Sequence, residues 1–192
     1  MSEKSDALAV PVDVAMRRPS LFGVPAMPIL AAPLVVRRAQ VEDAGALASL
    51  LGRAFEAESW DAVGTEHELF FDDTVRATLV VAAGEGVVAT ASLQVRPDGP
   101  DCGWVRWVTT DLDRRREGLA RALVIGVLVM AEQAGCREAR LRTQTDRLAA
   151  IRLYLQLGFE PFVRSDPERE VWEQVIRLLS GEAGGGHIAP AG

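Results

Sequence analysis

The segment TTDLDRRREGLARALVIGVLVM, residues 109–130, sets three consecutive arginines beside a glycine at the start of a long apolar run. The first turn of a helix exposes four unpaired N–H groups and carries about half a positive charge. A glycine there lets a ligand approach the backbone, and arginines add bidentate donors for phosphate oxygens. The pattern therefore predicts either a phosphate cradle or a solvated charged loop ahead of a core helix. The residues of this candidate cradle are Arg115, Arg116, Glu117, Gly118, Leu119, Ala120 and Arg121.

Two familiar phosphate-binding motifs do not explain this segment. A Walker-type loop requires Gly-Lys-Ser/Thr, which does not follow the glycine. Residues 84–89 match the dinucleotide fingerprint G-x-G-x-x-A, but that fingerprint requires a helix directly after its glycines. The sequence that follows, VVATASLQV, is rich in β-branched residues and predicts a strand.

The composition excludes several classes of partner. The chain has 192 residues with 27 Asp and Glu against 21 Lys and Arg, so we expect no nucleic-acid partner. Its two cysteines, Cys102 and Cys136, form no disulfide framework and indicate a reducing, cytoplasmic compartment. The two histidines lie far apart, which predicts no metal site. We expect neither a signal peptide nor a membrane span, because the apolar run 21–36 is short and interrupted by prolines.

Hydrophobic periodicity and turn residues divide the chain into three parts. Residues 1–33 are a Pro/Ala-rich extension, expected to be flexible or draped over the surface, and residues 181–192 are a flexible Gly-rich tail. Residues 34–180 form one α/β domain. We expect strands at 34–40, 77–83, 87–95, 102–110, 137–144 and 159–164. We expect helices at 41–55, 116–135, 146–158 and 165–181, with 60–73 an acidic helix or loop.

The order of these elements and two motifs resemble the GCN5-related N-acetyltransferase (GNAT) family over residues 34–165. In that family an R/Q-x-x-G-x-G/A loop binds the pyrophosphate of acetyl-CoA, and it corresponds here to Arg115, Gly118 and Ala120. A later A-x-x-L-Y-x-x-x-G-F signature matches at Tyr154 and Gly158. The resemblance implies a mixed, mostly antiparallel sheet flanked by helices, with acetyl-CoA as the acyl donor and no metal.

The resemblance also implies how acetyl transfer is assisted. A backbone N–H on the strand before the loop, matched by Val108, Thr109 and Thr110, stabilises the developing oxyanion. Tyr154, the only tyrosine, is the candidate acid that protonates the departing thiolate, with a packing role as the alternative. Either Trp104 or Trp107 is a candidate to line the acceptor pocket, although both suit core packing.

The sequence does not identify the general base. The segment 60–73 borders the acceptor site in the family, and a water relay or a merely solvated acidic face are the alternatives to a base there. The candidates in this segment are Glu66, His67, Glu68, Asp72 and Asp73.

Three departures from the family pattern carry expectations of their own. Glu117 places a negative charge beside the phosphates, and we expect its side chain to point outward. Arg116 stands where a glycine is frequent, and we expect its amide to face inward. Residues 168–179 read as a helix where the family usually adds a seventh strand, so the sequence predicts no seventh strand there.

We therefore expect an acetyl-CoA-dependent N-acetyltransferase that acts on the primary amine of a small molecule or peptide. A non-catalytic acyl-CoA sensor, or an acyltransferase with another acyl donor or acceptor, are the alternatives. The N-terminal extension is also a candidate to cover the acceptor pocket or to mediate a homodimer.

Overall fold

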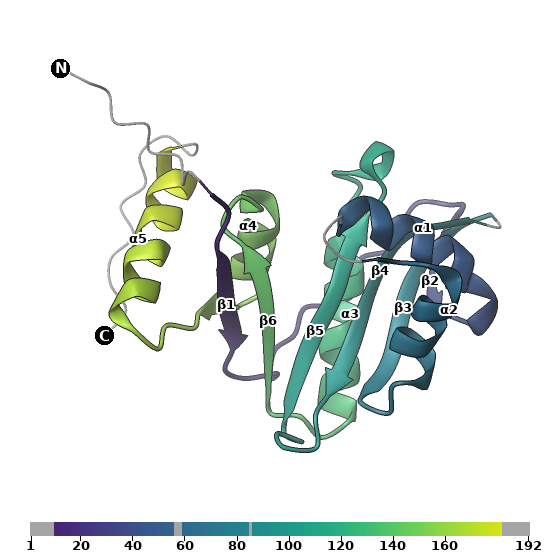
Figure 1. Ribbon diagram of the computed structural model, residues 1–192, viewed down its shortest axis with the longest axis horizontal. Helices are drawn as coiled ribbons and strands as arrows, with labels where there is room; N and C mark the ends of the chain where they lie inside the picture. The colour runs from purple at the N-terminus through teal and green to yellow at the C-terminus, as the bar shows by residue number, and fades with distance from the viewer. Residues whose placement is uncertain (1–9, 56–58, 85, 182–192) are drawn as a thin grey trace. The chain divides into compact units, whose positions relative to one another are not determined.

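The computed structural model describes residues 10–55, 59–84 and 86–181 (Figure 1). The strands are β1 (Asp13–Arg18), β2 (Leu34–Arg38), β3 (Val75–Ala83), β4 (Gly86–Val95), β5 (Cys102–Thr110), β6 (Glu138–Gln144) and β7 (Glu160–Pro161). The α-helices are α1 (Ala44–Ala54), α2 (Ala62–Glu66), α3 (Leu119–Gln133), α4 (Leu148–Gln156) and α5 (Asp166–Gly181). Short 3-10 turns η1 (Val41–Asp43) and η3 (Leu112–Arg114) and the π-helical turn η2 (His67–Phe71) complete the set.

The strands pair in the order β2-β3-β4-β5-β6-β1-β7, with β5 and β6 parallel and the pairs β2-β3, β3-β4, β4-β5 and β1-β7 antiparallel. The predicted mixed, mostly antiparallel sheet with flanking helices is confirmed. The chain divides into a larger unit, Arg18–Leu141, and a smaller unit formed by Met1–Arg17 and Arg142–Gly192. No helix of the described residues combines the length and apolarity needed to cross a bilayer.

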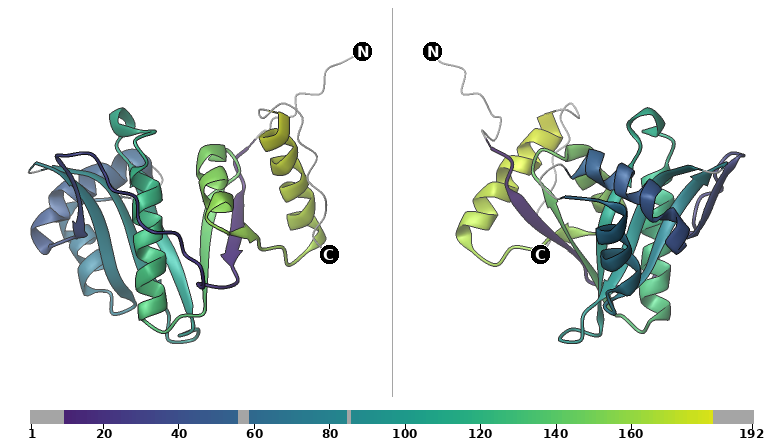
Figure 2. Two further views of the ribbon diagram at one scale, coloured as in Figure 1. Left: turned by 180° about the vertical axis from the view of Figure 1, so that it is seen from behind. Right: turned by 45° about the vertical axis from the view of Figure 1, so that its right-hand side comes forward.

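In the larger unit, helices cover both faces of the β2–β5 sheet. Figures 1 and 2 show α3 against one face and α1 and α2 against the other. Helix α3 is apolar almost all round and comes close to the sheet at two points. A Cβ placed on Gly126 would lie 2.7 Å from Leu79 Cδ1, and one on Gly103 would lie 2.9 Å from Ala131 Cβ. Glycine at these positions lets helix and strands approach.

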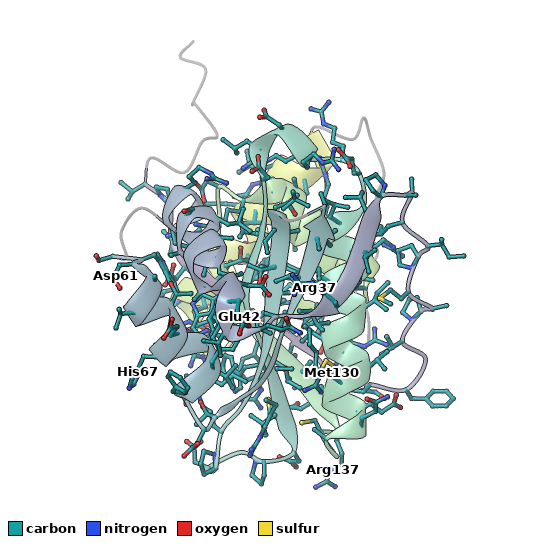
Figure 3. All side chains as sticks on the ribbon, turned by 90° about the vertical axis from the view of Figure 1, so that its right-hand side faces the viewer. Arg37, Glu42, Asp61, His67, Met130 and Arg137 are labelled. Carbon is teal, nitrogen blue, oxygen red and sulfur yellow. The ribbon has the colours of Figure 1, made fainter. Side chains whose placement is uncertain are left out.

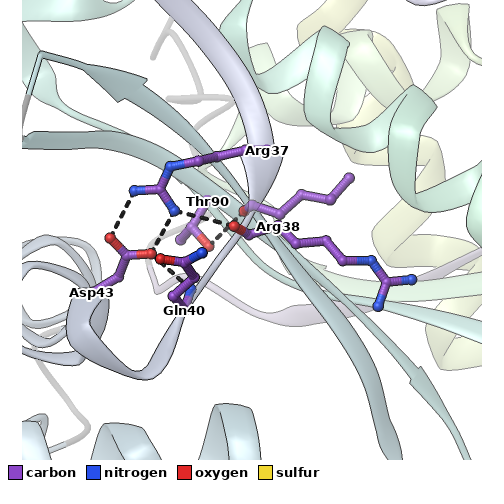
Figure 4. Close-up of polar contacts among 6 residues, drawn as sticks. Arg37, Arg38, Gln40, Asp43 and Thr90 are labelled. Carbon is purple, nitrogen blue, oxygen red and sulfur yellow. Dashed lines mark hydrogen bonds and ion pairs between the residues drawn. The ribbon is translucent and has the colours of Figure 1, made fainter.

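A half-buried ion pair fixes the connection from β2 into α1 (Figure 4). Arg37 donates to both carboxylate oxygens of Asp43, at 2.6 and 2.8 Å, and the Gln40 backbone N–H donates to the same carboxylate at 2.8 Å. The bond from Arg37 is the main reason that the pKa of Asp43 lies below its ordinary value. Because the chain enters α1 held at this turn, the apolar face of the helix is directed onto the sheet, with Leu47 and Leu51 fully buried.

In the smaller unit, the N-terminal segment supplies a strand that the sequence did not reveal. We expected residues 1–33 to be flexible or surface-draped, yet Asp13–Arg18 forms β1, with Met16 fully buried. Met16 pairs with Pro161, and the Phe162 amide donates to the Ala15 carbonyl at 2.9 Å. The expectation is wrong for these residues because apolar Val14 and Met16 alternate with Asp13 and Arg17, a period-two pattern that buries one face.

Strand β1 also answers the question of the seventh strand. The segment 168–179 is helical, as predicted, and lies within α5. The sheet nevertheless has seven strands, because β1 occupies the place between β6 and β7. The last strand predicted at 159–164 shrinks to Glu160–Pro161, in part because a proline has no N–H to donate to a ladder.

Candidate functional site

A β-bulge in β5 lies directly before the residues expected to carry the oxyanion donor. The β4–β5 ladder changes register between the pairs Thr90↔Thr109 and Ser92↔Arg106. Trp107 lies inside this irregularity with φ of 49°, a backbone region that a bulky side chain rarely adopts. Bulges redirect a strand and interrupt its pairing, and they occur often beside functional sites. The bulge therefore sets the direction of the backbone at Val108, Thr109 and Thr110.

The β5–β6 ladder of the larger unit covers only the beginning of β5. Its pairs are Cys102↔Glu138, Gly103↔Ala139 and Trp104↔Arg140. In the described residues of this unit, positions 105–110 of β5 make no such pair with β6. Within the larger unit, the β6 side of β5 is therefore paired only at its beginning. The oxyanion role of residues 108–110 stays a prediction.

The N-terminus of α3 presents unpaired amides around a glycine. Gly118 is the N-cap, with φ of 78°, and a Cβ built on it would meet no atom within 4 Å. The first intrahelical bond runs from the Ala122 N–H to the Gly118 carbonyl at 3.0 Å. The amides of Leu119, Ala120 and Arg121 precede it and have no acceptor within the part of the chain that the structure describes. Such amides, with the helix dipole behind them, bind anions.

The charges around these amides are mainly positive. Arg115 and Arg116 are exposed and Arg121 is half-buried, and no carboxylate of the described residues lies within 4.0 Å of their cationic groups. Glu117 is held by Arg114 at 3.4 Å, with its side chain 37% exposed. Its negative charge is therefore compensated within the loop. Arg114 was not among the predicted site residues, although the Arg-x-x-Glu spacing is a signal for such a pair.

The loop is anchored to the sheet and to α1 through Asp111. The Asp111 N–H donates to the Val88 carbonyl at 2.8 Å, and the Asp111 carboxylate accepts from Arg53 at 2.9 Å. It also accepts from the Asp113 amide at 3.2 Å, which closes η3. These contacts pre-organise the loop ahead of the helix without drawing on Arg115 or Arg116.

Arg116 has a positive φ of 70°, in the left-handed region that favours glycine. Arg116 thus holds a backbone conformation that glycine would adopt without strain. The hydroxyl of Thr110, at the end of β5, is buried and has no partner in the described residues. The residues around Gly118 thus fit a diphosphate: they combine open space at the glycine, free amides and cations without an ion pair in the described residues.

Tyr154 lies in the smaller unit, on α4. It is buried, and its ring meets the Phe159 ring edge to face, with the centroids 5.8 Å apart. Burial raises the pKa of its phenol to about 12, slightly offset by the charge of Arg147. Tyr154 is therefore protonated at neutral pH, as a proton donor must be.

The candidate bases lie on α2, η2 and the turn that follows, and the charge of His67 contributes slightly to the lowered pKa of Asp72. His67 is exposed and points away from the sheet (Figure 3). The Thr74 hydroxyl and amide donate to Asp72 at 2.7 and 2.8 Å, and these bonds lower the pKa of its carboxyl. A carboxylate stabilised in this way is a weaker base. In the described residues, no three His, Cys, Asp or Glu side chains come together as metal ligands would.

The two tryptophans of β5 have different surroundings. Trp107 is buried in the core cluster with Leu51 and Val80, and its ring meets the Trp60 ring edge to face, with the centroids 6.2 Å apart. Trp104 is half-buried under the Arg96 guanidinium, 5.0 Å from the ring centre. Packing thus accounts for Trp107.

Comparisons with known structures and families agree with this geometry. No curated protein matches the sequence. A putative GNAT acetyltransferase from Novosphingobium aromaticivorans is 23% identical with a TM-score of 0.58, over 78% of this chain and 59% of its own. A GCN5-related N-acetyltransferase from Sphaerobacter thermophilus is 21% identical with a TM-score of 0.65, over 80% and 49%. This chain thus spans about half to three fifths of those two proteins.

A shorter relative gives similar coverage of both chains. The diaminobutyrate acetyltransferase of Paenibacillus lautus, solved with L-2,4-diaminobutyric acid and coenzyme A, is 22% identical with a TM-score of 0.54, over 66% of this chain and 75% of its own. At these identities the structures show a shared fold. The family model for the acetyltransferase (GNAT) family matches residues 46–159, which is more than half of the chain and includes the loop 115–121. The chain belongs to the GNAT acetyltransferase family.

Proposed function

We propose that this protein is an N-acetyltransferase that uses acetyl-CoA and acts on the primary amine of a small molecule or peptide. The observation that carries the proposal is the N-terminus of α3, where Gly118 leaves open space beside three unpaired amides. That the Paenibacillus lautus relative was solved with coenzyme A and a diamine supports this choice of donor and acceptor class.

Each part of the site has a proposed task. The amides of residues 118–121, with Arg115, Arg116 and Arg121, hold the diphosphate of the donor. A backbone N–H among Val108, Thr109 and Thr110 donates to the carbonyl oxygen on which negative charge develops. Bound acetyl-CoA supplies the thioester whose acetyl group is transferred. Tyr154 holds the proton that the leaving sulfur requires.

A cytoplasmic location is part of the proposal. Cys102 and Cys136 are both buried free thiols, and burial raises the pKa of Cys102 to about 12. Two unpaired cysteines fit a reducing compartment.

The test compares two glycines of the same helix. Gly118 and Gly135 flank α3, both have positive φ (78° and 85°), and a Cβ on either meets no atom within 4 Å. Gly118→Ala and Gly135→Ala therefore introduce the same backbone strain, about 1 kcal/mol each. We expect coenzyme A to raise the melting temperature of wild type and Gly135→Ala but not of Gly118→Ala. An equal rise in melting temperature for both variants would show that coenzyme A binds at another part of the chain.

Turnover is tested separately by release of free thiol from acetyl-CoA in the presence of amines, amino acids, polyamines and peptides. We expect thiol release with at least one amine and none without an acceptor. A thermal shift with no thiol release for any acceptor would instead support the non-catalytic sensor.

A further inference from the structure

The smaller unit contains a pocket that the proposed acetyl transfer does not use. Its volume is about 180 Å³, room for about six water-sized groups. Val14, Phe162, Val171 and Trp172 give it apolar walls from β1, the segment after β7 and α5. A wall of this kind takes an aliphatic or aromatic body of small size.

Two charged residues of the pocket neutralise each other. Glu168 accepts from the Arg164 guanidinium at 2.8 Å and from the Arg164 backbone amide at 2.7 Å. These bonds lower the pKa of the Glu168 carboxyl, and the charge of Arg142 adds a smaller contribution. Neither member of this pair leaves a full charge for a ligand.

Two other charged residues of the pocket have no such partner. Asp13, at the start of β1, and Arg142, on β6, are exposed and line the same pocket. Neither makes an ion pair within 4.0 Å with any residue that the structure describes. The pocket therefore offers one unpaired anion and one unpaired cation beside an apolar wall.

A buried aromatic ring completes the apolar wall. Trp172 is only 3% exposed, and it lines the pocket together with Phe162. Its ring therefore offers an aromatic surface to the apolar body of a ligand.

We propose that this pocket binds a free α-amino acid with an apolar side chain. Arg142 receives the carboxylate, Asp13 receives the ammonium group, and the apolar wall that includes Phe162 and Trp172 receives the side chain. A purely anionic or purely cationic ligand would satisfy only one of the two unpaired charges. The proposal does not depend on acetyl transfer, and its test uses the full chain without coenzyme A.

The probes are L-phenylalanine, phenethylamine, which lacks the carboxylate, and 3-phenylpropanoate, which lacks the ammonium group. Binding is followed by the NMR signal of the Trp172 indole N–H, identified by its loss in Trp172→Phe. We expect L-phenylalanine to bind at least tenfold more tightly than either analogue. No saturable change of this signal, or equal affinity for all three probes, would overturn the proposal.

Single substitutions test the contributions of Arg142 and Asp13 separately. We expect Arg142→Gln to lower the affinity for L-phenylalanine to that of phenethylamine, and Asp13→Asn to lower it to that of 3-phenylpropanoate. Arg169→Gln and Asp166→Asn are matched controls, because both are exposed residues of α5 that do not line the pocket. An effect of Arg142→Gln without one of Asp13→Asn would mean a simple carboxylate site and would contradict the amino-acid assignment.

Discussion

Two residues, Trp107 in β5 and Arg116 in the loop before α3, hold backbone angles that their side chains do not favour. Gly118 at φ 78° is suited to its position, whereas Arg116 at 70° and Trp107 at 49° are not. Strain of this kind costs about 1–3 kcal/mol per residue and persists where the surroundings fix the conformation. Here the anchoring of Asp111 by Arg53 and Val88 supplies that constraint. The loop is thus held in shape before any ligand binds.

The strain at Arg116 can be measured. Replacing Arg116 with Gly removes the unfavourable φ, whereas Arg116→Ala removes the same charge and keeps the strain. We expect Arg116→Gly to be more stable than Arg116→Ala by about 0.5–1 kcal/mol in denaturant unfolding. Equal stability of the two variants would show that the left-handed conformation is not retained in solution.

Tyr154 is tested as a proton donor by Tyr154→Phe. The substitution removes only the hydroxyl, which has no hydrogen-bond partner in the described residues, so the melting temperature should change little. We expect kcat to fall about 100-fold, the size of a general-acid contribution, with KM for acetyl-CoA within twofold of wild type. An unchanged kcat would leave Tyr154 only a packing role beside Phe159.

The pKa of Tyr154 adds a prediction about pH. Since burial raises this pKa to about 12, the phenol loses its proton in the folded chain later than in the unfolded chain, whose value is about 10. Folded-state stability therefore falls as pH rises from 10 toward 12, and Tyr154→Phe should weaken that fall. Parallel urea titrations of both proteins at pH 9 and 11 measure it, and identical losses would contradict the burial of the phenol.

Among the elements, β1 changes the interpretation of the N-terminal region most. A segment that precedes the family match contributes a paired strand, with Val14 and Met16 buried. The strand has only six residues, and the prolines that follow it conceal it in a sequence-based reading. Residues 13–18 of the N-terminal extension therefore supply the additional strand of the seven-stranded sheet.

The structural role of β1 is tested by Met16→Ala, with Val12→Ala as its control. Met16 is fully buried, whereas Val12 is 39% exposed. Loss of a buried methionine side chain costs about 2–5 kcal/mol, so we expect Met16→Ala to lower the free energy of unfolding by that amount. Val12→Ala should cost less than about 1 kcal/mol. Similar small losses for both would mean that β1 is not part of the stable sheet.

For the whole molecule, the sequence predicts the fold class and most of the elements well. Helix α3 and strands β3, β4 and β5 follow from apolar periodicity and the Gly-rich turn between residues 83 and 87. It also predicts that a glycine beside arginines starts this helix, whereas phosphate binding by that loop stays a prediction. What the sequence does not reveal depends mainly on contacts distant in sequence: the pairing of β1 with β7 and the bulge at Trp107. The pair Arg114–Glu117 was missed although its i,i+3 spacing is local.

The central claim is that the first backbone amides of α3 bind the diphosphate of acetyl-CoA. A crystal structure of the complex with coenzyme A tests it most directly. The account predicts the two linked phosphates within hydrogen-bonding distance of the backbone N–H groups of Leu119, Ala120 and Arg121, with Gly118 facing them. Density for the diphosphate at any other part of the chain would contradict it.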